Sequence, residues 1–294
     1  MKYLRWLMCL LCLTSLTLAS VQTDECEHNI SKSCYDLGID SYKNAKTKKA
    51  QLQSAELLAK SCHFGYASGC TDLGLLFYSG SKGIAKNWER AAYFFMKGCK
   101  KKSYKGCSNL GFMYFKGIGF KQNERYAQKL FTMACEHNSS LGCRNLGVLY
   151  HQGSSKIRNY LMAKKAYRKG CDLKDMTACN NLGVMYQYAI GIKKSYIKAV
   201  NLYKLSCEGA YPTACSNLGY MYEKGLGVKY SFKNALPYYR IASDYEDLRG
   251  MYNLARLYFT GLGIKEDKDK AKILFKKACQ GGLKRSCTYF KMMF

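Results

Sequence analysis

The sequence predicts an all-α protein, a solenoid of about seven helix-hairpin repeats of 36 residues stapled by disulfides. Fourteen of its sixteen cysteines form seven Cys-x7-Cys pairs that recur at a near-constant interval. Between the pairs, small and apolar residues recur at helical spacing, and self-similarity at this period is typical of stacked repeats. With two prolines and no alternating apolar pattern, the chain offers no clear site for a β-sheet.

The cysteine pairs set the repeat length. First cysteines of successive pairs lie 36, 37, 36, 36 and 36 residues apart, and then 72, which is two repeats with one pair missing. The missing pair would fall at Ser243 and Met251. The pairs are Cys26 and Cys34, Cys62 and Cys70, Cys99 and Cys107, Cys135 and Cys143, Cys171 and Cys179, Cys207 and Cys215, and Cys279 and Cys287.

Residues 1–19 have the features of a signal peptide. Lys2 and Arg5 precede an apolar stretch that ends in small residues, where a signal peptidase cleaves. The stretch is shorter than the roughly 20 residues of a spanning helix, which argues against an uncleaved anchor. We expect cleavage after Ala19, a secreted or periplasmic protein, and no transmembrane segment after cleavage.

The remaining cysteines are expected to form disulfides. An even number of cysteines in an oxidising compartment indicates disulfide bonds. Zinc is the competing interpretation, but the four histidines have no common position relative to the cysteines, and the mature pairs lack the short spacing of a zinc knuckle. We therefore expect no metal and no cofactor.

The first helix of each repeat follows the second cysteine. Leucine and tyrosine four residues apart, as at Leu218 and Tyr222, lie on one helical face. A glycine between them costs about 1 kcal/mol relative to alanine, so its recurrence predicts close approach of a neighbouring helix. A second glycine is expected to end the helix in the left-handed conformation. The packing glycines are Gly38, Gly74, Gly111, Gly147, Gly183 and Gly219, and the capping glycines are Gly80, Gly117, Gly153, Gly225 and Gly261.

The second helix of each repeat begins at a residue that can cap it. An alanine follows four residues later and an aromatic residue four after that, a small-then-large stripe suited to packing against another helix. The caps are Asn87, Asn123, Asn159, Ser195, Ser231 and Asp267, the alanines are Ala91, Ala127, Ala163, Ala199, Ala235 and Ala271, and the aromatics are Phe95, Phe131, Tyr167, Tyr203, Tyr239 and Phe275.

These elements fill nearly the whole mature chain. We therefore expect one domain over residues 20–294. The repeat without cysteines has Pro237 in its second helix and an acidic cluster at 244–247, which predicts a kink or soft joint over 232–251. The predicted repeats lie near 33–65, 66–102, 103–138, 139–174, 175–210, 211–246 and 247–282, with a terminal half repeat at 283–294.

The run Leu-Gly-x2-Tyr-x2-Gly-x-Gly, complete at 110–119 and 218–227, resembles the Sel1-like repeat, a relative of the tetratricopeptide repeat. Together with the signal peptide and the cysteine pairs, it makes residues 20–294 similar to the Helicobacter cysteine-rich proteins. The resemblance implies a right-handed α-solenoid in which each disulfide clamps an antiparallel helix pair. It also implies penicillin binding or slow β-lactam hydrolysis, since relatives are described as penicillin-binding proteins and β-lactamases.

The residues themselves give little support to an enzyme. Serine β-lactamases need Ser-x-x-Lys together with Lys-Thr-Gly, because the lysine must lie one helical turn from the nucleophile. Ser79 with Lys82 and Ser195 with Lys198 match the first motif at about the frequency expected by chance, and the second motif is absent. These four residues are the catalytic candidates, and a β-lactamase is the alternative function.

A ligand-binding scaffold is the leading hypothesis. In a tetratricopeptide-like solenoid the first helices line the inner curve, and the residue two after each second cysteine is Asp or Asn. Such a ladder could hold the backbone of a peptide or a glycan, or its members could bond to the adjacent repeat instead. The ladder is Asp36, Asp72, Asn109, Asn145, Asn181, Asn217 and Asn253.

The charge favours acidic partners. Lys and Arg number 47 against 20 Asp and Glu, for a net charge of +27, or +25 without Lys2 and Arg5. Such a field attracts polyanions, so a polyanion-binding surface protein is a second alternative, although a proteome that is basic throughout would give the same charge. We expect a monomer that binds a protein or peptide, or an anionic cell-wall or host-surface glycan, with a β-lactam as a further possible ligand. Export argues against nucleic acid.

Overall fold

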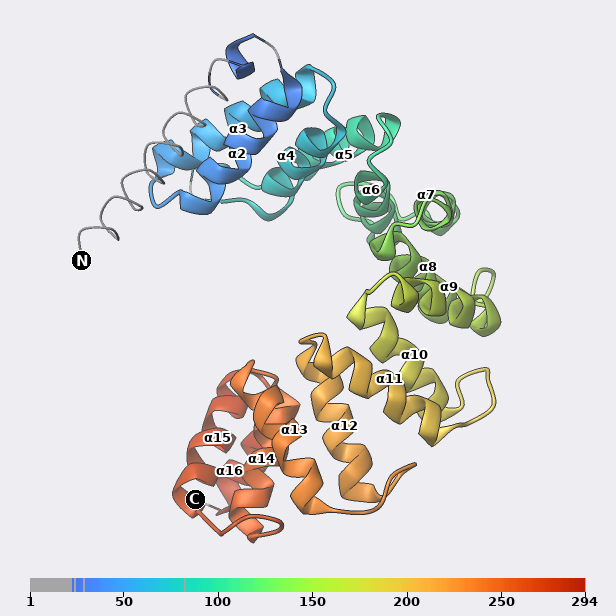
Figure 1. Ribbon diagram of the computed structural model, residues 1–294, viewed down its shortest axis with the longest axis vertical. Coiled ribbons are helices and arrows are strands. Elements are labelled where there is room, and N and C mark those ends of the chain that lie inside the picture. Colours follow the sequence, from blue (N-terminus) through green and yellow to red (C-terminus); the bar gives the residue numbers. More distant parts are fainter. Residues whose placement is uncertain (1–22, 24, 29, 82, 294) are drawn as a thin grey trace, which may run out of the picture. The chain divides into compact units, whose positions relative to one another are not determined.

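The computed structural model describes residues 23, 25–28, 30–81 and 83–293, and these residues are almost entirely helical (Figure 1). The predicted signal peptide, residues 1–19, and the catalytic candidate Lys82 lie outside them. Over the described residues the extended structure is limited to one isolated bridge between Ser81 and Ile84. None of the described helices is both long enough and apolar enough to cross a membrane.

The chain forms two compact units, one ending at Asn145 and the other beginning at Leu146, and the boundary falls within α8 (Ser140–Gln152). In each unit consecutive helices pack as hairpins, with even-numbered helices as the first and odd-numbered helices as the second of each repeat. This arrangement confirms the predicted all-α repeat fold. The first unit contains α2 (Ser31–Asn44), α3 (Lys48–His63), α4 (Ala67–Ser79), α5 (Trp88–Lys100), α6 (Tyr104–Lys116) and α7 (Glu124–Glu136). The second contains α9 (Tyr160–Asp172), α10 (Met176–Tyr188), α11 (Tyr196–Glu208), α12 (Pro212–Lys224), α13 (Phe232–Asp244), α14 (Leu248–Thr260), α15 (Lys268–Gln280) and α16 (Lys284–Met293).

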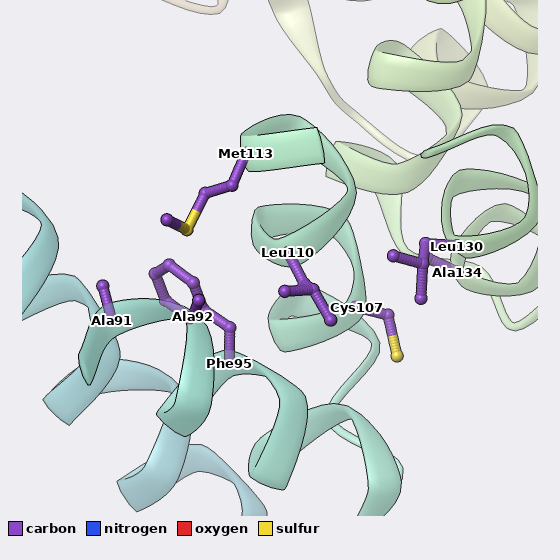
Figure 2. Close-up of a cluster of buried hydrophobic side chains, with 8 residues drawn as sticks. All are labelled: Ala91, Ala92, Phe95, Cys107, Leu110, Met113, Leu130 and Ala134. Atoms are coloured by element: carbon purple, nitrogen blue, oxygen red, sulfur yellow. The ribbon is translucent and has the colours of Figure 1, made fainter. Parts of the chain in front are cut away.

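The predicted close approach at glycine is present in the hairpins that have this glycine, whereas α14 has Ala255 at the equivalent position. A Cβ atom placed on Gly183 would lie 2.7 Å from the ring of Tyr203, and one on Gly111 would lie 2.7 Å from the ring of Phe131. The aromatic rings and the alanines one turn before them are fully buried or nearly so. Figure 2 shows one of these rings, that of Phe95, beside Ala91 on α5, with Met113 of α6 turned toward it.

Helix ends follow the predicted capping chemistry with two exceptions. All six predicted N-cap side chains accept a backbone N–H from the first turn of their helices. Gly117, Gly225 and Gly261 end their helices in the left-handed conformation. Gly153 does not have a positive φ, and Gly80 has a φ of 72° with a ψ of 160°, so the predicted left-handed helical caps at these two glycines are wrong.

Seven disulfides join the predicted pairs, with Cα atoms 4.4 to 4.7 Å apart. From Cys62 onward, each links the end of a second helix to the following first helix, as Cys99 of α5 does with Cys107 of α6. The repeat is therefore clamped where its hairpin meets the next.

The second helix of the repeat without cysteines continues past its proline. Helix α13 is unbroken through Pro237, which lies on its exposed side. The acidic cluster also has a structural use, because Asp247 caps α14 by accepting the Gly250 N–H at 2.8 Å and receives the Thr213 hydroxyl at 3.0 Å. That residues 232–251 are a kink or soft joint stays a prediction.

Candidate functional site

The first helices of the second unit form a pocket of about 880 Å³, lined by residues of α10, α12, α14 and α16. Its buried lining residues are Gln187, Ser216, Glu223 and Tyr252, while Arg249 and Lys284 are exposed. Pockets of this size accommodate small ligands or a short stretch of peptide. This is the candidate site.

Glu223 is a buried carboxylate beneath the pocket, with a side chain only 1% exposed. It accepts hydrogen bonds from the Tyr239 hydroxyl at 2.9 Å and from Arg256 at 3.2 Å, and it pairs with Lys224 at 2.9 Å. Burial alone would raise the pKa of Glu223, but the bond from Lys224 and the charge of Arg256 outweigh burial and lower it. Glu223 is therefore ionised and neutralises part of the local positive charge.

The phenols of Tyr239 and Tyr252 remain neutral. Burial, followed by the charge of Glu223, raises the pKa of Tyr239. Burial, followed by a bond to Tyr289, raises the pKa of Tyr252 to about 12. These hydroxyls therefore act as hydrogen-bond donors or acceptors at neutral pH, and their rings add amphipathic surface for a ligand.

The pocket keeps a net positive charge. Five basic residues line it against one acidic residue, Glu223. Lys224 and Arg256 pair with Glu223, whereas Arg249, Lys284 and Arg285 make no ion pair with any residue that the structure describes. Three exposed positive charges are therefore available to an anionic ligand.

Two members of the predicted ladder, Asn217 and Asn253, line this pocket. Asn217 also donates its amide to Oδ1 of Asn180 at 2.8 Å, and Asn180 donates to Asn181 at 3.4 Å. Part of the ladder therefore bonds to the adjacent repeat, the alternative to ligand binding.

In the first unit the ladder is also divided. The carboxylate of Asp72 receives the Tyr35 hydroxyl at 2.9 Å and Lys105 Nζ at 3.0 Å. Asn109 and Asn145 line a separate apolar pocket of about 230 Å³. Asp36, at the start of the ladder, is partly exposed on α2.

Comparison with known proteins decides the family. The Sel1 repeat model matches residues 67–103, 105–139, 140–175, 177–211, 212–244 and 248–283, more than half of the chain. The chain belongs to the Sel1-repeat family. Six of its predicted hairpins correspond to these Sel1 repeats.

Two solved structures share the fold of this chain over most of its length. A Sel1-repeat protein from Oxalobacter formigenes is 27% identical, with a TM-score of 0.68 over 83% of this chain and 96% of that chain. A protective antigen of uropathogenic Escherichia coli is 23% identical, with a TM-score of 0.73 over 92% of this chain and 58% of that chain. Cysteine-rich protein B of Helicobacter pylori is 27% identical over 47% of this chain and 98% of that chain, with a TM-score of 0.38.

A curated relative matches only in part. Cytochrome c oxidase assembly factor 7 of Xenopus tropicalis is 30% identical over 100 residues, which is 33% of this chain and 43% of the relative. The chain thus matches less than half the length of that relative.

The catalytic candidates of this Sel1-repeat protein have structural contacts of their own. Ser79 donates its hydroxyl to the Leu75 carbonyl at 2.9 Å, and Ser195 caps α11 by accepting the Lys198 N–H at 3.4 Å. The Lys198 ammonium lies over the ring of Tyr186, 5.5 Å from its centroid. These contacts do not assemble a nucleophile and base.

Sequence reasoning missed the basic and tyrosine residues of the pocket. Three residues after the ladder, the Sel1 repeats carry Leu75, Phe112, Val148 and Val184, then Tyr220 and finally Arg256. A change from apolar to polar at one register was the signal that could have located the site.

Proposed function

We propose that this Sel1-repeat protein is an exported, disulfide-stapled scaffold that binds an extended peptide segment of a protein partner on the first helices of its second unit. Sel1 repeats form protein-interaction modules. The observation that carries the proposal is the pocket of about 880 Å³, in which Asn217 and Asn253 lie on consecutive first helices.

The residue types suit an extended peptide. An asparagine amide offers both a donor and an acceptor, and can pair with a peptide bond whatever the ligand sequence. Exposed Tyr188 and Tyr220 supply contact area at low entropic cost. A surface that is already built before binding loses little affinity to reorganisation.

The cysteines support export. Seven disulfides persist in an oxidising compartment and are rare in a reducing cytosol. A secreted or periplasmic location, reached through the predicted signal peptide at residues 1–19, is part of the proposal.

Peptide display tests this function. Oxidised protein spanning 20–294 is used to select 12-residue peptides from a library unbiased in charge, and the affinity of selected peptides is measured. Replacing Asn217 and Asn253 by alanine should weaken binding roughly tenfold, since each lost hydrogen bond contributes about 0.5–1.5 kcal/mol. The matched control replaces Asn201 and Asn234, which are exposed on the second helices α11 and α13. Failure to select any peptide, or equal loss in both double variants, would overturn the proposal.

A further inference from the structure

Resting on this proposed function, we infer that the pocket of the second unit selects acidic peptides, with Arg249 and Arg285 binding ligand carboxylates beside Asn217 and Asn253. The support comes from the charges that successive repeats carry at two equivalent positions.

In the first unit, an ion pair within the protein has the same geometry as the contact that we propose between an arginine and a ligand carboxylate. Lys105 stands two residues before the second cysteine of its repeat, and Asp72 stands at the ladder position of the preceding repeat. Lys105 Nζ lies 3.0 Å from the Asp72 carboxylate. A basic side chain at this position of α6 therefore reaches a carboxylate at the ladder position of α4.

The second unit has the basic residues of this pair without the acidic ones. Arg249 of α14 and Arg285 of α16 occupy the position of Lys105, counting Met251 in place of the missing cysteine. The preceding ladder residues are Asn217 and Asn253, which carry no charge. Both arginines line the pocket, and no described residue forms an ion pair with either of them. A carboxylate from a ligand would supply the missing partner.

These arginines do not benefit the helices that carry them. Arg249 and Arg285 are the second residues of α14 and α16. Positive charge in the first turn opposes the helix dipole and is unfavourable for the helix by a few tenths of a kcal/mol or more. Their positive charge fits ligand binding better than helix stability.

The pocket separates the charges available to a ligand from those already used. Glu223 is the one acidic residue of the lining, and it is buried against Lys224 and Arg256. It therefore does not compete for Arg249 or Arg285. Guanidinium groups bind carboxylates through two parallel N–H bonds, which favours side chains of Asp or Glu in the ligand. The neighbouring asparagine amides favour a peptide backbone between those side chains.

Three probes of stated composition test the inference by fluorescence anisotropy on protein spanning 20–294. The first is a decapeptide of alternating Asp and Gly, the second is the same peptide with Asn for Asp, and the third is an oligogalacturonate of similar charge. We expect the Asp peptide to bind at least about tenfold more tightly than the Asn peptide, and its affinity to fall as salt rises, because partly exposed ion pairs are screened.

Charge-reversal variants locate the contact. Arg249→Glu with Arg285→Glu should weaken binding of the Asp peptide at least about tenfold. The control, Arg168→Glu with Arg240→Glu, makes the same change of net charge at exposed sites on α9 and α13 and should change the affinity by less than about threefold. Equal loss in both double variants would show attraction to overall charge alone and overturn the inference.

A second variant does not depend on charge reversal being tolerated. Asn217→Asp with Asn253→Asp places carboxylates at the ladder positions, as Asp72 does in the first unit. The arginines should then pair within the chain, and binding of the Asp peptide should fall at least about tenfold while the protein remains folded. Unchanged binding of the Asp peptide to this variant would contradict the inference.

The outcomes separate the inference from the function on which it rests. If the Asp and Asn peptides bind equally and both depend on Asn217 and Asn253, the scaffold function stands and the acidic selectivity is wrong. If neither these peptides nor library peptides bind, the scaffold function itself fails. Tighter binding of the oligogalacturonate, lost in the same arginine variants, would overturn the peptide assignment in favour of an acidic glycan.

Discussion

Replacing Glu223 by glutamine is the sharpest test of the charged network beneath the pocket. The preceding repeat already has Gln187 at the equivalent position, where it receives the Tyr203 hydroxyl at 2.6 Å. Glu223→Gln can therefore keep the hydrogen bond from Tyr239 while removing the negative charge. The variant isolates the ionic contacts to Arg256 and Lys224.

The expected loss of stability in Glu223→Gln depends on how exposed the two basic partners of Glu223 are. Removing one partner of a fully buried ion pair costs about 3–5 kcal/mol, because the remaining charge is left without water. Here the Arg256 side chain is 30% exposed and that of Lys224 is 47% exposed, so both recover part of their hydration. We expect Glu223→Gln to destabilise the fold by about 1–2 kcal/mol, between the buried and the surface limits.

Two further variants test the hydrogen bond from the Tyr239 hydroxyl to Glu223. Glu223→Leu also leaves the buried Tyr239 hydroxyl without its acceptor, which should cost a further 1–3 kcal/mol or so. Adding Tyr239→Phe should recover much of that extra loss. An earlier repeat has two buried phenylalanines, Phe115 and Phe131, at the positions of Glu223 and Tyr239, so an apolar pair fits here.

Thermal unfolding of the oxidised protein, followed by circular dichroism, measures these effects. A loss of about 1–2 kcal/mol corresponds to a fall in Tm of roughly 2–4 °C for a chain of this size. The pKa of Glu223 is lowered in the folded state, so the stability it contributes is present above its unfolded pKa of about 4.3 and is lost as pH falls through the lower folded value. Equal Tm values for wild type and Glu223→Gln at pH 7, or a difference that persists unchanged at pH 2, would refute the reasoning.

Three further predictions concern the repeats. Gly183→Ala should lower Tm, because a Cβ atom 2.7 Å from the Tyr203 ring costs about 1–3 kcal/mol of overpacking, whereas alanine improves helix propensity by about 1 kcal/mol. A raised Tm would contradict close approach as the reason for the glycine. Ser243→Cys with Met251→Cys should form an eighth disulfide, detected by mass spectrometry, and stabilise the protein by roughly 2.5 kcal/mol, whereas two free thiols after oxidation would show that this repeat does not share the geometry of the others. Residues 232–251 should exchange amide hydrogens faster than the flanking repeats because Pro237 removes a helical hydrogen bond, and equal protection would exclude a soft joint.

The fold was largely predictable because the same packing and capping residues recur at equivalent positions in successive repeats. A single glycine, alanine or asparagine indicates little, but Gly183 against Tyr203 and the cap at Ser195 belong to patterns that recur in register. Helix α13 stays continuous at its proline for a physical reason. Pro237 falls on the exposed face of α13, where neighbouring contacts hold the helix despite one missing donor.

The site was less predictable because it depends on departures from the repeat. The positions of the ladder were visible in the sequence. Whether a ladder residue is bonded within the protein depends on its neighbour in space: Lys105 forms an ion pair with Asp72, whereas Asn253 has no charge with which to form one. Glu223 gave no sign in isolation, since its burial and its three partners come from α12, α13 and α14 together. Such contacts between helices are set by packing and not by spacing along the chain.

The most direct test of peptide binding on the first helices is site-specific photo-crosslinking to a peptide selected by display. A benzophenone side chain replaces Tyr188 or Tyr220, which line the pocket, or replaces Tyr230 or Tyr245, exposed tyrosines of the same unit outside it. The proposed function predicts covalent adducts from Tyr188 and Tyr220 that excess unlabelled peptide suppresses, with little adduct from the two controls. Adducts of equal or greater yield from Tyr230 and Tyr245 would contradict it.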